Sequence, residues 1–356
     1  MRCFLAEREG FEPSEHLVGI HAISSRAPSA TRASLHYRKT IFYRPNYTSG
    51  QGYLVKETSE PTSRSGFVAI VGLPNAGKST LVNQLTQTKL SIVSRKAQTT
   101  RNTVSIILTR PGAQIIFQDT PGFHEAKTMI NEVFLECIRK TIKLTDVILY
   151  VVDPGIKKLD LLYELERLVV ESHKPVVQAI NKIDMLDTKM LDNIINRASC
   201  DARFDSIIGI SALTGQNCDK LTERLIELLP EGPYLYSEDD LSDMPERFFA
   251  SEIVREQILQ LLGQEVPHKT AVTIETFKND GVSVLIQGNI HVERHSQKKI
   301  LIGKDGQMIK KIGTLARQKI KEFLDLPVRL ELFVKVSPNW TKSMNKLKEF
   351  GYLDNR

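Results

Sequence analysis

Cysteine is scarce in this sequence, and long apolar runs are missing. The four cysteines form no CxxC pair, and none has a histidine at zinc-ligand spacing. We therefore expect reduced, mostly buried thiols in a cytoplasmic protein, and neither a zinc site nor a disulfide scaffold. No apolar run approaches the roughly 20 residues that a membrane-spanning helix requires, which argues against an integral membrane protein. The 356 residues are too many for one compact core and suit two domains.

A strong excess of one charge is also lacking over most of the chain. The net charge is +6, and residues 65–232 carry 20 basic against 19 acidic side chains. The exception is residues 294–321, where Asp305 is the single acid beside nine basic residues. A solvated helix face explains most lysine-rich runs, but a ratio of nine to one favours a polyanionic partner.

From Phe67 onward, short apolar runs alternate with helical patterns of about 10–15 residues, a spacing typical of βαβ units. We expect strands at 67–72, 104–109, 114–119, 147–153, 175–181 and 206–211. We expect helices at 78–87, 130–143, 159–173, 188–199 and 217–229. This alternation predicts an α/β fold with a mostly parallel sheet and helices on both faces.

The remaining segments differ in composition. Residues 1–64 show no packing period and are expected to be a disordered extension of the first domain, which covers 65–232. The peptide GFEP near the start can be encoded by a sequence resembling the T-arm of a transfer RNA gene, so we expect a start codon placed too far upstream. The alternative, a transit peptide, fits poorly with four early glutamates. Residues 233–246 are expected to be a linker.

Residues 247–356 read as a smaller α+β domain. The pattern predicts a helix at 247–262, two strands, a basic helical stretch ending near Leu324, and a strand at 328–336. Gly303 and Gly306 form a GxxG loop within this basic stretch, with strands on both sides. That layout is typical of a type II KH domain, whose GxxG loop clamps about four nucleotides of single-stranded RNA. The expected RNA contacts are Lys298, Lys299, Ile302, Gly303, Lys304, Asp305, Gly306, Lys310 and Lys311.

The stretch GLPNAGKST at 72–80 fits the phosphate-binding pattern G-x-x-x-x-G-K-[ST] between a strand and a helix. Its glycines let the backbone approach a phosphate, and the helix N-terminus presents N–H groups. Lys78 is expected to reach the β- and γ-phosphates, and Ser79 to hold Mg²⁺. The expected nucleotide contacts of this loop are Gly72, Asn75, Ala76, Gly77, Lys78, Ser79 and Thr80.

Two segments complete the predicted phosphate and magnesium site. The motif DTPG ends a strand, so Asp119 suits a water-mediated Mg²⁺ contact and the Gly122 N–H suits the γ-phosphate. In AQTTR, Thr100, or alternatively Thr99, is expected to close on Mg²⁺ when a γ-phosphate is present. Lys78, Thr100 and Gly122 are therefore the first candidate catalytic residues.

Two later segments predict guanine as the base. In NKID at 181–184, the carboxylate of Asp184 can accept hydrogen bonds from N1–H and N2–H of guanine. Adenine lacks those donors and would leave a buried Asp184 unpaired. Asn181 and Lys182 would brace the pocket. In SALTG, the Ala212 N–H can reach guanine O6, with Ser211 and Leu213 beside it. The five motifs in this order predict a GTP- and GDP-binding switch that uses Mg²⁺.

Together these stretches resemble the Era family of bacterial GTPases over residues 66–356. The resemblance rests on GLPNAGKST, KAQTTRNTV, DTPGF, NKID, SALTG, the junction helix ERFFASEIVREQIL, and ERHSQKKILIGKDGQMIKKIG. It implies a P-loop GTPase domain followed by a type II KH domain. It also implies binding to the 3′ end of small-subunit ribosomal RNA and a role in assembly of the small ribosomal subunit. Separately, we expect a monomeric cytoplasmic protein, with a peripheral contact at the inner face of the cell membrane left open. The family commonly has a polar or charged residue where Leu213 stands.

Phe123 follows DTPG, where many GTP-hydrolysing switches have a glutamine that orients the attacking water. One interpretation is that Phe123 only packs, and that intrinsic hydrolysis is slow. The other comes from the resemblance: similar GTPases with an asparagine at the position of Asn75 use K⁺, which makes Asn75 a K⁺ ligand and a fourth catalytic candidate. Two other functions stay open at this point: an RNA-binding protein with GTP as a structural ligand, and a GTPase whose second domain contacts a membrane.

Overall fold

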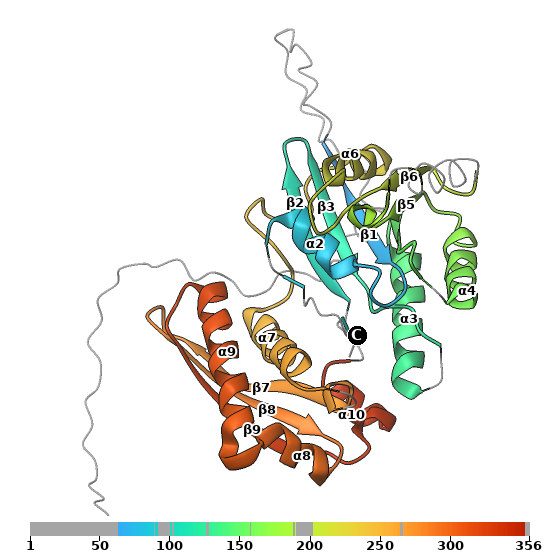
Figure 1. Cartoon of the computed structure of the whole chain (residues 1–356). Helices are drawn as coiled ribbons and strands as arrows, with labels where there is room; N and C mark the ends of the chain where they lie inside the picture. The colour runs from blue at the N-terminus through green and yellow to red at the C-terminus, as the bar shows by residue number, and fades with distance from the viewer. Residues whose placement is uncertain are drawn as a thin grey trace, which may run out of the picture.

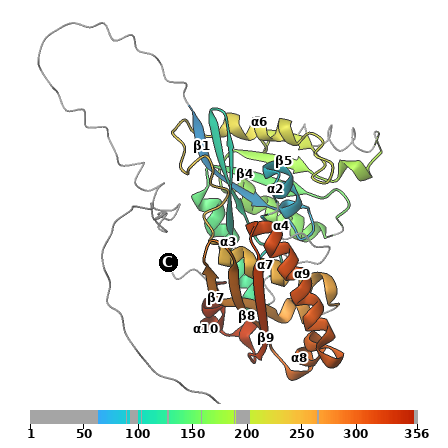
Figure 2. The same cartoon turned by 90° about the vertical axis from the view of Figure 1, so that its left-hand side faces the viewer.

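The computed structural model describes residues 63–352, with gaps at 89, 92–99, 102, 126–127, 157, 188, 190–201 and 264–265. The extension predicted before residue 63 lies outside the described residues, as does nearly all of the helix predicted at 188–199. No helix in the described part of the chain combines the length and the apolar character needed to cross a membrane. The described chain forms two units, one above the other in Figure 2.

A six-stranded sheet forms the centre of the first domain, in the order β2-β3-β1-β4-β5-β6. Its strands are β1 (Arg64–Val71), β2 (Val104–Arg110), β3 (Ala113–Asp119), β4 (Val147–Val152), β5 (Val176–Ile180) and β6 (Ser206–Gly209). Only the β2–β3 pairing is antiparallel, which confirms the mostly parallel α/β sheet. β1 begins one residue before the predicted domain boundary at 65.

Helices cover both faces of this sheet (Figure 1). They are α2 (Lys78–Thr86), α3 (Met129–Leu144), α4 (Leu159–Val170) and α6 (Cys218–Leu228). Because side chains alternate along a strand, Val68 and Ile70 of β1 pack with α2 and α6, whereas Ala69 and Val71 pack with α3 and α4. α4 ends three residues before the predicted end at 173. β1 and β3 are parallel neighbours, so their carboxyl ends lie at the same edge of the sheet, where DTPG meets the phosphate-binding loop.

The predicted linker, 233–246, is fastened to the first domain along β2 and β3. The backbone N–H of Ile107 donates to the carbonyl of Leu241 at 2.9 Å. The Ser105 hydroxyl donates to the Asp243 carboxylate at 2.8 Å. Further along, the side chain of Gln114 accepts from the N–H groups of two linker residues. We call this segment the strap; its hydrogen bonds leave little free chain before the second domain.

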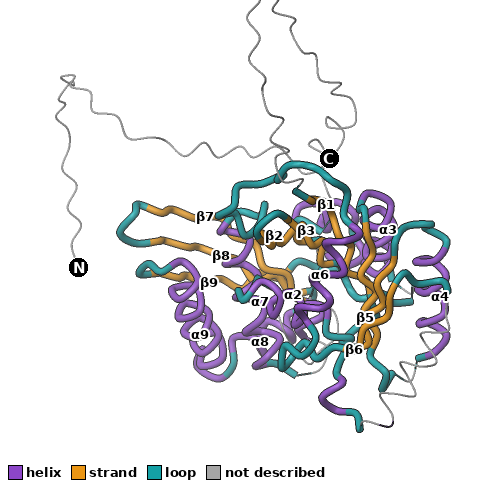
Figure 3. The backbone as a smooth tube through the Cα atoms, turned by 90° about the horizontal axis from the view of Figure 1, so that it is seen from above, coloured by secondary structure: helices purple, strands orange, loops and turns teal. Residues whose placement is uncertain are grey.

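The second domain begins with α7 (Glu246–Leu261) and continues through a three-stranded sheet in the order β7-β8-β9. Its further elements are β7 (Thr270–Asn279), β8 (Val284–Val292), α8 (His295–Ile302), α9 (Gln307–Leu324), β9 (Val328–Val336) and α10 (Met344–Glu349). β7 and β8 are antiparallel, whereas β8 and β9 are parallel. α7, α8 and α9 cover one face of the sheet (Figure 3). This arrangement confirms the predicted type II KH fold; α10 was not predicted.

Candidate functional site

Two glycines of the 72–80 loop are required by close packing in the first domain. A Cβ on Gly72 would lie 2.4 Å from the carbonyl oxygen of Val151 in β4, so the loop leaves β1 against a neighbouring backbone. Gly77 has φ +99°, and a Cβ there would lie 2.1 Å from Nδ2 of Asn181. Gly77 is also the N-cap of α2, so the loop leads directly into the helix N-terminus. This geometry presents N–H groups at the helix start, as the phosphate-binding pattern predicts.

Lys78 lies buried within this loop. Its ammonium donates to the carbonyl oxygens of Gly72 at 3.0 Å and Leu73 at 3.3 Å, and the residue is 6% exposed. Burial lowers the pKa of Lys78 to about 8, although the nearby Asp119 carboxylate opposes this shift. A buried cation is costly unless an anion compensates it. The loop is therefore built to receive negative charge such as a phosphate.

The three predicted magnesium residues converge on one point. The Ser79 hydroxyl donates to Oδ2 of Asp119 at 3.2 Å and lies 3.0 Å from the Thr100 hydroxyl. The Thr100 hydroxyl also donates to Asp119 Oδ2, at 3.2 Å. The Ser91 hydroxyl donates to the same oxygen at 3.1 Å. Ser91 was missed because it belongs to no recognisable motif, and Thr99, the predicted alternative to Thr100, lies outside the described residues.

The Asp119 carboxylate fits a hard cation. Its Oδ1 atom is buried and has no hydrogen-bond partner among the described residues, whereas Oδ2 accepts three hydroxyls. Burial raises the pKa of Asp119, with Lys78 and the hydroxyl donors opposing the shift. Hydroxyl and carboxylate oxygens are the ligands that Mg²⁺ prefers, and a cation would satisfy the unpaired atom. Ser79, Thr100 and Asp119 are therefore the residues that would hold Mg²⁺.

The predicted guanine residues form a network that connects three loops. Nδ2 of Asn181 donates to the Ala76 carbonyl at 2.8 Å, and its Oδ1 accepts from the Ala212 N–H at 2.9 Å. The Ala212 N–H, expected at guanine O6, is thus engaged by Asn181 in this structure. Asn181 is 2% exposed. It consequently ties the phosphate-binding loop to the SALTG loop.

Asp184 lies at the open side of this network. Its Oδ1 accepts a hydrogen bond from the Ser211 hydroxyl at 2.5 Å. The residue is exposed, rather than buried as expected from the sequence, because it lies in the short 3-10 turn that follows β5. Lys182 forms an ion pair with Asp153 at 2.5 Å, a partner that sequence reasoning missed. Leu213 is 75% exposed, so its side chain contributes little to packing here. The carboxylate of Asp184 is accessible and oriented by Ser211, as a base-reading group requires.

Phe123 is buried in the core of the first domain, in a cluster that includes Leu73 of the phosphate-binding loop. It is 1% exposed and packs in the same cluster as Leu135 and Ile138 of α3. Its backbone N–H donates to the Gly72 carbonyl at 3.1 Å, which holds DTPG against the loop. Gly122 comes equally close, since a Cβ there would lie 3.0 Å from Cα of Pro74. These contacts agree with the interpretation that Phe123 packs, and its buried ring has no means of orienting a water.

Asn75, the predicted K⁺ ligand, is exposed at the tip of the phosphate-binding loop. Its φ of +64° is a left-handed conformation that asparagine tolerates better than most residues. Thr80 follows Ser79 in the first turn of α2 and is half-buried. Asn75 is thus positioned on the outside of the loop, where a further ligand can approach.

The two glycines of the KH loop differ in what requires them. Both have φ +75°, but a Cβ on Gly303 would lie 2.7 Å from Cβ of Met308, so the protein's own packing excludes a side chain. A Cβ on Gly306 would meet nothing within 4 Å. Gly306 is the N-cap of α9, and Asp305 before it has φ +50°. The space beside Gly306 is open to an approaching molecule.

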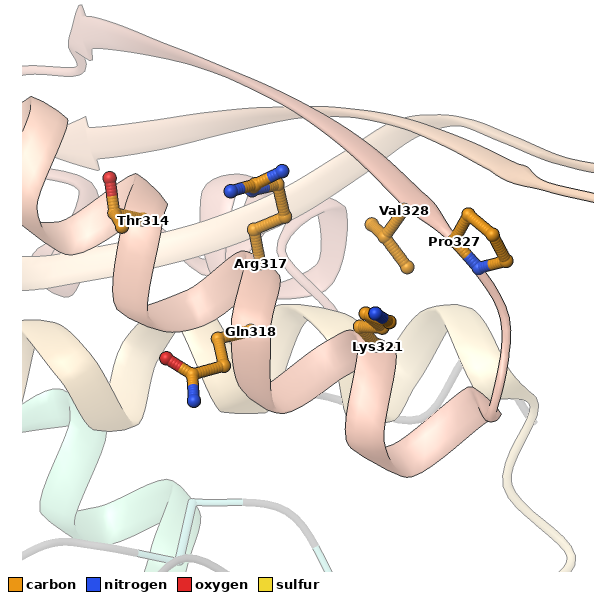
Figure 4. Close-up of a pocket in the computed structure, with 6 residues that line it drawn as sticks. All are labelled: Thr314, Arg317, Gln318, Lys321, Pro327 and Val328. Carbon is orange, nitrogen blue, oxygen red and sulfur yellow. The ribbon is translucent and has the colours of Figure 1, made fainter.

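Basic side chains surround this loop. Of the predicted RNA contacts, Lys298 and Ile302 are half-buried, and the exposed ones are Lys299, Lys304, Asp305, Lys310 and Lys311. Farther along α9, Arg317 and Lys321 line a pocket at the start of β9 (Figure 4). Sequence reasoning counted these two in the basic stretch but did not assign them to the site. The exposed lysines beside the GxxG loop suit a polyanion.

Comparisons with known proteins cover both domains. A family model described as 50S ribosome-binding GTPase matches residues 67–182, and a KH domain model matches residues 265–341. GTPase Era of Geotalea daltonii is 44% identical over 296 residues, which are 83% of this chain and 99% of that protein. GTPase Era of Ruminiclostridium cellulolyticum is 42% identical over 299 residues, 82% of this chain and 99% of that protein.

Two solved structures are similar over both domains. One is Era in complex with MgGDPNP and nucleotides 1506–1542 of 16S ribosomal RNA, with a TM-score of 0.79 and 40% identity over 82% of this chain and 100% of that chain. The other is a variant of Aquifex aeolicus Era bound to GDP·AlF4⁻, with a TM-score of 0.76 and 39% identity over the same shares. With this identity across both domains, the chain belongs to the Era family of GTPases.

Proposed function

We propose that this GTPase is a nucleotide-controlled switch that binds the 3′ end of small-subunit ribosomal RNA and acts in assembly of the small ribosomal subunit. The observation that carries the proposal is the convergence of Ser79, Thr100 and Asp119 on one point, in a chain that also presents an open GxxG loop. A site for a purely structural ligand would not need Thr100, because this residue lies outside the phosphate-binding loop.

We assign different roles in GTP hydrolysis to different residues of the first domain. The Lys78 ammonium moves its hydrogen bonds from the loop carbonyls to the β- and γ-phosphate oxygens, and the Gly122 N–H donates to the γ-phosphate. Ser79, Thr100 and Asp119 would hold Mg²⁺, which would neutralise charge that develops on the phosphates. Asp184 reads guanine from its open side, and Asn181 keeps the phosphate and base loops in register.

A monovalent cation at Asn75 is our proposal for the role that glutamine has in other switches. Phe123 is buried, so another group must offset the charge that develops between the β- and γ-phosphates. The Asn75 amide oxygen is an exposed candidate ligand for K⁺ at the loop tip. We expect phosphate release to rise several-fold when Na⁺ is replaced by K⁺ at constant ionic strength. Asn75→Ala should lose this response and keep nucleotide affinity; equal rates in the two salts would contradict the proposal.

The KH domain supplies the proposed RNA site. A single-stranded RNA backbone can approach Gly306 closely because no protein atom fills the space where a side chain would lie. The exposed lysines around the loop add charge that RNA phosphates would neutralise. The 16S ribosomal RNA bound to the solved Era structure supports the choice of the 3′ end as ligand.

Single-turnover hydrolysis with and without an RNA oligonucleotide of this 3′ end tests the function. We expect slow cleavage of GTP alone and faster cleavage with RNA; no turnover in either case would favour a structural role for GTP.

Sedimentation with anionic vesicles, with RNA as competitor, addresses a peripheral membrane contact. We propose a monomeric protein of the cytoplasm, which sizing at micromolar concentration checks.

A further inference from the structure

Arg101 extends from the first domain into the second. Its side chain is 2% exposed, although it follows directly after Thr100 in a polar stretch. Nη1 donates to the carbonyl of Thr270 at 2.7 Å and to the Tyr352 hydroxyl at 3.1 Å. Nη2 donates to the carbonyls of Pro267 and His268, both at 3.1 Å. All four acceptors belong to the KH domain.

Two aromatic rings complete this binding site for the guanidinium. Its central carbon lies 5.6 Å from the centroid of the Tyr352 ring and 6.0 Å from that of Trp340. Trp340 is fully buried, and its indole N–H donates to the Lys269 carbonyl at 3.0 Å, so its position is fixed by the same chain segment. Carbonyl dipoles and ring faces both favour a cation. The C-terminal segment and the start of β7 thus form a receptor for a single arginine.

Thr100, which directly precedes Arg101, is one of the three residues of the magnesium cluster. The Thr100 hydroxyl lies 3.0 Å from that of Ser79 and donates to Asp119 at 3.2 Å. One peptide bond joins Arg101, whose guanidinium is held by the KH domain, to Thr100, whose hydroxyl lies at the magnesium cluster. A shift of the Arg101 backbone also moves Thr100, because consecutive Cα atoms are only about 3.8 Å apart. The buried contacts of the guanidinium restrain that backbone.

We propose that Arg101 is a positioning residue for GTP hydrolysis, through which the KH domain holds Thr100 in the geometry that binds Mg²⁺. Ser79, Thr100 and Asp119 all belong to the first domain, but the second domain positions Thr100 through its contacts with Arg101. The inference rests on the proposed role of Thr100. The competing explanation is that Arg101 only anchors one domain to the other, like the apolar contact between Phe134 of α3 and the C-terminal segment.

The test uses the full chain and measures single-turnover GTP hydrolysis over a range of free Mg²⁺ concentrations. In Arg101→Ala we expect the Mg²⁺ midpoint to rise about tenfold, which corresponds to about 1.4 kcal/mol. GDP affinity should stay within twofold, because Arg101 contacts neither Lys78 nor the guanine residues. Arg101→Lys keeps the charge but not the planar fork, so it should recover only part of the loss.

Tyr352→Phe removes one hydroxyl acceptor on the KH side and keeps the ring, so it is expected to fold even if Arg101→Ala does not. It should raise the Mg²⁺ midpoint two- to threefold, and should add nothing in the Arg101→Ala background, because both changes act on one contact. Phe134→Leu is the matched control: it alters the apolar part of the same domain interface and should leave the midpoint within twofold.

Thr100→Ala distinguishes the magnesium role of Thr100 from the positioning role of Arg101. Suppose that the Mg²⁺ midpoint is raised in Thr100→Ala but stays at the wild-type value in Arg101→Ala and Tyr352→Phe. This result would overturn the positioning role of Arg101 and leave the magnesium role of Thr100 standing. A raised midpoint in Phe134→Leu equal to that in Arg101→Ala would reduce Arg101 to an anchor. An unchanged midpoint in Thr100→Ala would remove the proposed magnesium role of Thr100, and the inference with it.

Discussion

The two candidate sites of this chain are built in opposite ways. At the phosphate end of the nucleotide site, Lys78 is 6% exposed and Asp119 is fully buried, and each is held by several hydrogen bonds. At the KH loop, Lys304, Lys310 and Lys311 are exposed, and Gly306 faces open space. Buried polar groups discriminate strongly between ligands, because a mismatched ligand leaves them unpaired. Exposed cations attract any polyanion and discriminate weakly.

The largest effect is expected at the base-reading group. Asp184→Asn keeps an oxygen that can accept from Ser211, but it places an amide donor against the guanine edge. We expect GTP affinity to fall by about 100-fold or more, and affinity for xanthosine triphosphate to rise. A fluorescent-nucleotide titration measures both. Unchanged GTP affinity would show that the guanine assignment is wrong.

A smaller effect is expected on the exposed side. Gly306→Asp places a carboxylate where the RNA backbone approaches, and we expect about a 30-fold loss of RNA affinity, equivalent to about 2 kcal/mol. Gly306→Asn is the matched control, since both side chains tolerate the left-handed backbone and only one is charged. GTP affinity should stay within twofold in both variants. Intact RNA binding by Gly306→Asp in a filter assay would contradict the KH site.

The smallest effect is a difference in pH dependence between the two sites. Burial lowers the pKa of Lys78 to about 8, and the charged form is the one that binds phosphate. Nucleotide affinity should therefore be highest well below pH 8 and fall as the pH rises through 8, on the order of tenfold between pH 7.5 and 9.0. RNA affinity should change less than twofold, because exposed lysines form that surface. Parallel titrations of labelled GDP and RNA check this; equal slopes would erase the distinction between the sites.

The local parts of the structure were predictable from sequence. The strand, loop and helix around 72–80 follow from a buried apolar run and the chemistry of phosphate binding, and β9 has the predicted bounds. The convergence of Ser79, Thr100 and Asp119 followed from motif order. These features depend on residues close together in the chain, or on the rule that parallel strands present their carboxyl ends at one edge.

Contacts between segments far apart in the chain were not predictable from sequence. Arg101 reads as one more cation in a polar stretch, and its receptor is assembled from residues about 170 to 250 positions later. Ser91 lacks a motif, and the strap reads as a linker because its prolines and acids conceal the backbone pairing with β2. In each case the decisive partner is distant in sequence, and no local period encodes it.

The strap has a consequence for how the two domains meet. Its last hydrogen bond to β2 is made by Asp243, and α7 begins at Glu246, so two residues lie between this hydrogen bond and the first helix of the second domain. A short connection keeps the KH receptor at a millimolar effective concentration relative to Arg101. Release of Arg101 is therefore followed by recapture within the same molecule, without a bimolecular search. The rate of that recapture is independent of protein concentration.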